Sequence, residues 1–174
     1  MSVLEQIKNN AISDLHLEAG ADDVFDNIND FFDALPENSS LETIKLENDF
    51  IGDLRNTERT QLLEALAKVR NLQELYLADG LFMVNDLTKF AMSHKRIRKL
   101  TLKDILFQGV EEHFNACELA LYGHGSLKEF KMEDCTSAVD GISLEKLQVA
   151  GDKLVTSGGI KSEIERNPAG ATTA

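Results

Sequence analysis

The chain has 174 residues, 43% of them hydrophobic, and a formal net charge of −12 at pH 7. This length favours a single domain with a sizeable core. The negative charge argues against nucleic acid and anionic membranes as partners, because binding to either depends on Lys and Arg that neutralise phosphates.

The first predicted element is a short helix that ends near Ile7. Ser2 and Glu5 fit the capping box Ser-x-x-Glu, in which each side chain accepts a hydrogen bond from the backbone N–H of the other residue. This pairing predicts a helix start at the beginning of the chain.

Beyond this helix, apolar residues recur with a spacing of three and then two. The spacing fits neither the period of a helix nor that of a strand, so it indicates a chain that turns into a short strand. It returns after about 30 residues each time, which indicates a repeat architecture. The five clear sets begin at Ile12, Leu41, Leu72, Ile97 and Leu127, and a sixth, weaker set is Leu144, Leu147 and Val149.

The segments between the sets predict one helix per repeat. Residues at equal distances before each set form columns that lie on one helical face. Gly109 with Glu111 favours a helix start, and Gly123 favours a helix end. The columns are apolar except for Arg59: Phe31, Leu62, Leu87 and Cys117; Leu35, Leu66, Ala91 and Leu121; Ile28, Arg59, Val84 and Phe114.

Each unit is therefore predicted to be a strand, a loop and a helix, which bury their apolar sides only by stacking on neighbouring units. The pattern LxxLxL in "ISDLHL", "LETIKL", "LQELYL", "IRKLTL" and "LKEFKM" resembles the leucine-rich repeats. The long repeats with helices are most similar to the ribonuclease-inhibitor-like class, to which Ran GTPase-activating proteins belong. The resemblance covers about residues 2–150 and implies an α/β solenoid, or horseshoe, of about five units with a parallel concave sheet.

The pattern decays after Val149, and we divide the chain soon after it. Residues 1–156 are predicted to form the leucine-rich repeat domain, and residues 157–174 a cap remnant or a flexible tail. A solenoid needs a cover over its last apolar layer. Either residues 154–164 fold over Leu144 and Leu147 as a cap, or the natural protein continues as a longer array.

Residues that alternate with the apolar positions of each strand are expected to face the concavity. This face carries both signs of charge, with an acidic surplus at the N-terminal end, where residues 1–40 hold nine acidic residues and one Lys. A charge gradient of this kind orients a charged protein partner. The columns also include Ala78 and, from the sixth set, Lys146, Gln148 and Ala150. The candidate protein-binding residues are His16, Lys45, Glu47, Glu74, Tyr76, Lys99, Thr101, Lys103 and Lys131.

Tyr76 is the best candidate for an interface anchor, since aromatic side chains dominate interface energetics. The alternative is that the ring only packs on its neighbours. Both interpretations stay open on the sequence alone.

No spacing of titratable residues predicts catalysis, a metal or a cofactor. His113 and Cys117 are four residues apart, with His124 or Cys135 as a further zinc ligand, but the close ligand pairs of zinc sites are missing. Cys117 also belongs to an apolar column, which favours a small buried side chain. Arg59 suggests an arginine presented to a nucleotide or acidic partner, but the simpler interpretation is a stem that lies on a partly covered helix face.

We therefore expect a non-catalytic scaffold that binds a protein partner through the concave sheet, with no cofactor or metal, and with no nucleic acid, membrane or small-molecule partner. Two alternatives stay open. One is a regulator of a small GTPase, implied only by the resemblance to Ran GTPase-activating proteins, and the other is a structural segment of a larger repeat protein. Residues 1–10 lack the pattern of a signal peptide, and no stretch approaches the about 18 apolar residues of a membrane span, so we expect a cytoplasmic or nuclear location.

Overall fold

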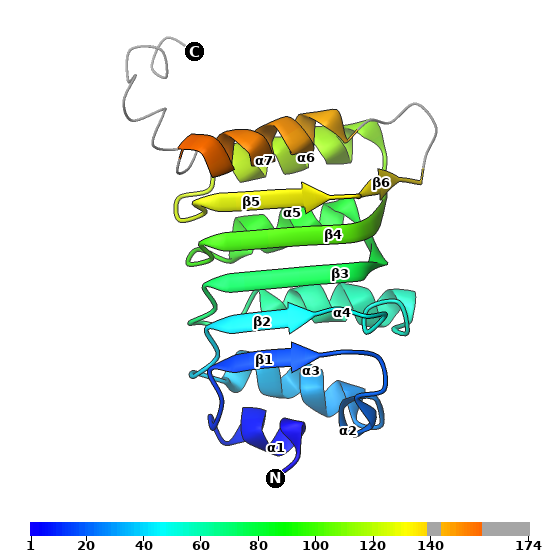
Figure 1. The fold of residues 1–174 in the computed structure, drawn as a ribbon, viewed down its shortest axis with the longest axis vertical. Coiled ribbons are helices and arrows are strands. Elements are labelled where there is room, and N and C mark those ends of the chain that lie inside the picture. Colours follow the sequence, from blue (N-terminus) through cyan, green and yellow to red (C-terminus); the bar gives the residue numbers. More distant parts are fainter. Residues whose placement is uncertain (139–143, 158–174) are drawn as a thin grey trace.

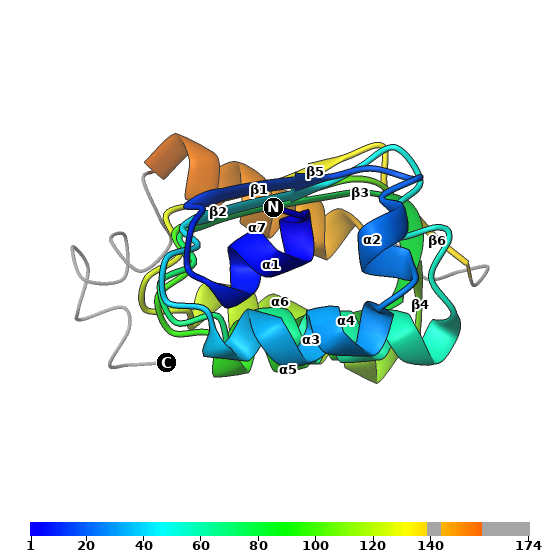
Figure 2. The same cartoon turned by 90° about the horizontal axis from the view of Figure 1, so that it is seen from below.

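The computed structural model of the chain describes residues 1–138 and 144–157, and the side chains of residues up to 155. A parallel sheet forms one layer, and the longer helices of the first four units form a second layer on one side of it (Figures 1 and 2). The strands are β1 (Asp14–Leu17), β2 (Thr43–Leu46), β3 (Glu74–Met83), β4 (Lys99–Gln108), β5 (Glu129–Glu133) and β6 (Thr136–Ser137). The helices are α1 (Val3–Lys8), α2 (Asp22–Phe25), α3 (Ile28–Glu37), α4 (Asn56–Leu66), α5 (Val84–Ser93), α6 (Glu111–Tyr122) and α7 (Glu145–Ser157).

The five clear apolar sets lie side by side as five neighbouring strands, as predicted. The strand order is β1-β2-β3-β4-β5, and each pair is parallel. Leu15, Ile44, Leu75, Leu100 and Phe130 are partners in successive pairs, so the sets stand in the register that their alignment in the sequence predicts. The chain therefore has an α/β solenoid architecture with a leucine-rich-repeat-like arrangement.

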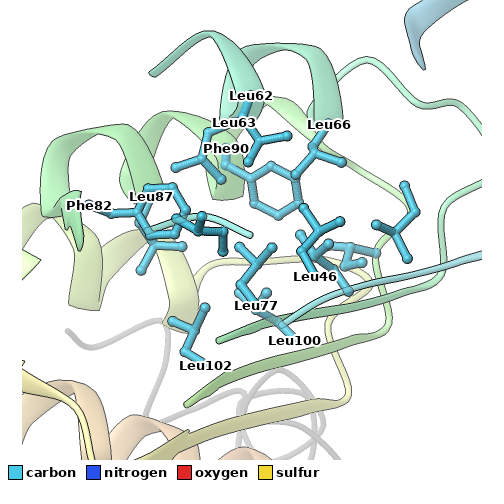
Figure 3. Packing of buried hydrophobic residues seen from close by; sticks show 14 of the residues in the cluster. Leu46, Leu62, Leu63, Leu66, Leu77, Phe82, Leu87, Phe90, Leu100 and Leu102 are labelled. Atoms are coloured by element: carbon cyan, nitrogen blue, oxygen red, sulfur yellow. The ribbon is translucent and has the colours of Figure 1, made fainter. Parts of the chain in front are cut away.

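The core lies between the sheet and the helices. Leu46, Leu77 and Leu102 point from the strands toward helix residues such as Leu66 and Phe90 (Figure 3), and all five are at most 1% exposed. Every second side chain of a strand and every third or fourth side chain of a helix points into this core, so both kinds of element contribute to one apolar layer. The predicted helix columns are accordingly buried at every position except Ile28 and Arg59, which are half-buried.

Each of the units from the second to the fifth contains a tight corner, which follows strands β2 and β5 and lies within the longer strands β3 and β4. Asn48, Asp79, Asp104 and Asp134 have φ angles of 50°, 58°, 51° and 52°, the left-handed region that Asn and Asp tolerate better than other side chains. The corner redirects the chain from the strand toward the helix layer. Because it recurs at one place in each unit, successive corners stack along one edge of the sheet.

The opposite edge, where the chain returns from a helix to the next strand, contains a ladder of buried polar side chains. His94 Nε2 donates to the carbonyl oxygen of Val69 at 2.8 Å, and His124 Nε2 donates to that of His94 at 2.7 Å. Asn38 Nδ2 donates in the same way to Ile7 at 2.7 Å. These three bonds each tie one unit to the preceding part of the chain and satisfy backbone groups that are removed from water.

Both ends of the core are covered by helices. At the first end, α1 buries Leu4 and Ile7, and its capping box is present, with Glu5 N–H donating to Ser2 Oγ at 3.2 Å. At the other end, α7 packs against β5 and α6. The approach of α7 is close, because a Cβ at Gly151 would lie 2.9 Å from the carbonyl oxygen of Phe130.

The prediction of a strand at the sixth apolar set is wrong. Helix α7 begins directly after Leu144 and buries Leu147 and Leu154, and Leu144 is buried as well. A spacing of three also fits a helix, and the short interval after Leu127 leaves no room for a separate helix before another strand. The cap that a solenoid needs is thus α7, which contains Leu147 instead of folding over it.

No helix among the described residues is both long and apolar enough to cross a membrane. The predicted division at residue 156 falls within the last turn of α7. Most of the predicted tail, residues 158–174, lies outside the described residues.

Candidate protein-binding face

The candidate face is the side of the sheet that points away from helices α3 to α6, and we name it the open sheet face (Figure 2). Strand pairing sets its residues in rows across the strands. His16 pairs with Lys45, Lys45 with Tyr76, Tyr76 with Thr101, and Thr101 with Lys131. The parallel row is Asp14, Thr43, Glu74, Lys99 and Glu129, and Lys103 lies between Ala78 and Glu133 in a third row.

Two groups of charged side chains occupy opposite ends of this face. Near β1, Glu47 Oε1 lies 2.8 Å from His16 Nε2 and 2.7 Å from Lys45 Nζ. The hydrogen bond with Glu47 raises the pKa of Lys45, and the same bond, with a smaller contribution from His16, lowers the pKa of Glu47. These charges therefore fix one another's side-chain positions at the N-terminal end of the face.

Near β5, Glu129 lies between two lysines, 3.1 Å from Lys131 Nζ and 3.4 Å from Lys99 Nζ. Burial acts to raise the pKa of Glu129, but the hydrogen bonds and charges of Lys131 and Lys99 outweigh it and lower the pKa. The pairs are largely exposed, so they set the shape of the surface more than they stabilise the fold.

Tyr76 is central between these groups and half-buried. Lys45 Nζ lies 5.0 Å from the centre of its ring, within the range of a cation–π contact. The ring is one wall of a shallow depression of about 340 Å³. The depression is lined by Thr43, Ile44, Lys45, Glu74, Leu75, Tyr76, Lys99, Thr101, Lys131 and Glu133. The structure thus brings six of the nine candidate residues around one hollow: Lys45, Glu74, Tyr76, Lys99, Thr101 and Lys131.

Three expectations about this face need correction. Thr101 is only 6% exposed because Tyr76 and Lys131 flank it, so it forms the floor of the depression and offers little contact area. Ala78 is 2% exposed, since β3 continues past it and turns at the left-handed Asp79. The sixth-set residues Lys146, Gln148 and Ala150 belong to α7 and are not part of the open sheet face.

One group of side chains has the composition of a metal site. His16, Glu18 and Glu47 place their ligand atoms within 4.8 Å of one another. Glu47 is already paired with Lys45, however, and Glu18 Oε1 accepts a hydrogen bond from Asn48 Nδ2 at 2.7 Å. A nearby ammonium group opposes a cation, so this group reads as an ion-pair cluster.

Two of the residues considered as zinc ligands, Cys117 and His124, are buried and have structural contacts instead. Cys117 is fully buried, and burial raises the pKa of its thiol to about 11, which opposes metal binding through the thiolate. His124 is held in the inter-unit ladder by the carbonyl of His94. Arg59 Nε donates to the carbonyl of Leu54 at 3.0 Å, which agrees with the simpler interpretation of a stem on a partly covered helix face.

Two features escaped the sequence-based predictions. The ladder residues Asn38, His94 and His124 each lie three positions before an apolar set, so a polar column was available as a signal. The second is the extent of a group of cations at the edge where the strands begin, outside the rows of the open sheet face. The sequence of the fourth unit already shows Lys95, Arg96 and Arg98 as a basic cluster. The cations that neighbouring units add to this cluster were not predicted. These cations are spread over the sequence and become neighbours only when the repeat units stack in the solenoid.

No protein-family model matches the sequence, and no curated protein sequence matches it significantly. Solved structures are similar in fold. A structure of leiomodin-1 actin-binding site 2 aligns with a TM-score of 0.63 and 13% identity, covering 98% of this chain and 95% of the other. The tropomodulin C-terminal domain of Caenorhabditis elegans aligns with a TM-score of 0.59 and 12% identity, covering 98% of this chain and 96% of the other. At such low identity the likeness supports the solenoid fold and leaves the function to the site itself.

Proposed function

We propose that this protein binds a protein partner through the open sheet face and catalyses no reaction. The observation that carries the proposal is the depression around Tyr76, where an aromatic ring lies between two groups that each contain positive and negative side chains. A rigid sheet holds these side chains at fixed spacing, which lowers the entropic cost of binding. Tyr supplies contact area at the centre, while charged residues around it select the partner and its orientation.

The partner suited to this face has both acidic and basic side chains. Lys45, Lys99 and Lys131 attract carboxylates, while Glu74 and Glu133, which line the same hollow, attract cationic side chains. Actin is the first partner to test, because one structure with this fold is named for an actin-binding site. No residue role is transferred from that structure.

The test is sedimentation with filamentous actin, together with affinity capture from a native lysate. The site variant combines Tyr76→Ala, Lys45→Glu and Lys131→Glu. The control combines Lys89→Glu and Lys146→Glu, which change the net charge equally on exposed helix positions. We expect the site variant to bind its partner at least about tenfold more weakly than the control, as loss of a central aromatic anchor does at many interfaces.

Thermal unfolding must show that both variants stay folded. Equal binding by the site variant and the control would refute the open sheet face as the binding site. If actin is not captured, but another protein is captured by the wild-type chain and lost with the site variant, actin is excluded as the partner and the open sheet face is retained as the binding site.

We do not extend the proposal to stimulation of a small GTPase. Only the resemblance to Ran GTPase-activating proteins implied that function. The arginine considered for a nucleotide or acidic partner, Arg59, bonds within the chain to the carbonyl of Leu54 and, at 3.1 Å, to Asn56 Oδ1. A GTP hydrolysis assay with a panel of small GTPases tests this alternative directly.

A further inference from the structure

A band of cations follows the edge of the solenoid where helices return to strands, at the left of Figure 1. We call it the basic edge. It gathers a third of the 18 Lys and Arg of a chain whose net charge is −12. Its members are exposed and come from the third, fourth and fifth units: Lys68, Arg70, Lys95, Arg96, Arg98 and Lys128.

The stacking of units makes this group continuous. Arg98 N–H donates to the carbonyl of Gln73 at 2.8 Å, and Lys128 N–H donates to that of Arg98 at 2.8 Å, so these residues occupy successive steps of one ladder. Neighbouring strands lie about 4.8 Å apart. The step from β3 to β5 is therefore about 10 Å, a length that about three residues of an extended peptide cover.

Two shallow depressions flank a ridge formed by Lys95 and Arg96. One, of about 270 Å³, is lined on its other side by Lys68 and Arg70. The second, of about 250 Å³, is lined by Asn71, Gln73, Arg98 and Ser126. The edge thus offers hollows whose charged side chains are all donors of hydrogen bonds.

The fold does not account for these charges by itself. None of the six forms a salt bridge with a carboxylate of the described residues. Cations at helix C-termini interact favourably with the helix dipole, which explains part of the preference at the ends of α4 and α5. Arg98 and Lys128, however, directly precede strands β4 and β5. The residues after α3, Ser39 and Ser40, carry no charge at the place of Lys95 and Arg96.

We propose that the basic edge binds an acidic peptide segment of another protein, rich in Asp or Glu. Arg pairs with carboxylates in a two-point geometry. An extended segment of about three residues spans the step from β3 to β5, so neighbouring acidic side chains of such a segment reach successive cations of the row. Nucleic acid and anionic membranes fit less well, because the remaining surface is strongly acidic and repels long polyanions and charged sheets. This site is separate from the open sheet face and does not depend on the function proposed for it.

Fluorescence anisotropy with a fluorescein-labelled ten-residue peptide containing six Glu tests the proposal. The same peptide with Gln in place of Glu is the probe for charge. We expect saturable binding of the Glu peptide at 50 mM salt, weakening as salt is raised, and no comparable binding of the Gln peptide. Reversal of three edge charges, Lys95→Glu, Arg96→Glu and Arg98→Glu, should weaken binding at least about tenfold.

The matched control reverses Lys8, Lys89 and Lys146 to Glu, which changes the net charge equally elsewhere. In case the charge-reversed variant does not fold, a second edge variant carries Lys95→Gln, Arg96→Gln and Arg98→Gln. Its unfolding temperature shows whether it is folded. Equal losses in edge and control variants, or no binding of the Glu peptide, would overturn the proposal. Tighter edge-dependent binding of a poly-dT oligonucleotide or of phosphatidylserine vesicles would overturn the class of partner.

Discussion

Acidification from pH 7.5 to 5.5 should destabilise this protein through its two ladder histidines. Each ring is held neutral by its contacts. His94 Nε2 donates to a carbonyl, while Nδ1 accepts from the N–H of Arg96 at 3.3 Å and of Ile97 at 3.0 Å. His124 repeats the arrangement with the two residues that follow Gly125. A second proton on either ring would point at backbone donors.

Burial is the main cause that lowers the pKa of His94 and of His124 in the folded state. The unfolded chain, with His pKa values near 6.5, therefore takes up protons first as the pH falls. The stabilisation that the two neutral histidines provide is fully present above about pH 6.5. It is lost progressively as the pH falls from there to the pKa of the folded state. At pH 5.5 the loss is at most about 1.4 kcal/mol per ring, or about 3 kcal/mol for both.

Urea unfolding at pH 7.5, 6.5 and 5.5 measures this loss as a fall in the free energy of unfolding. Replacement of both residues, His94→Asn with His124→Asn, should remove the dependence, because Asn38 makes the same kind of contacts without a titrating group. Glu47 and Glu129, whose pKa values are lowered in the folded protein, add a stabilisation that is present throughout this pH range and is lost only below about pH 4.5.

The test compares how steeply the free energy of unfolding falls with pH, and not its absolute value, because we expect the double variant to be less stable at every pH. A wild-type protein equally stable at pH 7.5 and 5.5 would refute the reasoning. So would a double variant that keeps the wild-type slope.

Three further predictions follow from packing. Gly80→Ala should lower the free energy of unfolding by about 1–3 kcal/mol, because its Cβ would lie 2.4 Å from Ile51 Cγ2; an unchanged urea midpoint would contradict this. Leu147→Ala should cost about 2–5 kcal/mol in the same assay, since α7 buries this side chain to 1% exposure, and a loss below about 1 kcal/mol would mean that α7 adds little to the core. In a Cys135→Ser background, Cys117 should react with a thiol reagent at pH 8 only after urea unfolding, because burial raises its pKa to about 11; rapid labelling of the folded protein would contradict its place in the core.

The repeat pattern was a sound guide wherever two independent signals agreed. Leu75 and Leu77 belong to a strand set, and Leu66 occupies a helix column at a constant distance before it, and all three are buried. At Leu144 and Leu147 only one signal was present, and a spacing of three suits a helix as well as the start of a strand set. The tertiary need to cover the last apolar layer decided in favour of a helix.

For the five clear apolar sets and the helix columns, the sequence by itself determined which side chains enter the core and which positions share a row of the open sheet face, because strand alternation and helix period follow from backbone geometry alone. Exposure within a row was decided by the tertiary structure, since the burial of Thr101 depends on Tyr76 and Lys131 from neighbouring strands. The buried histidine ladder and the continuous basic edge also arise from stacking. Residues far apart in the chain become neighbours only when one unit stacks on the next. Local secondary-structure propensity does not indicate which distant residues will meet in this way.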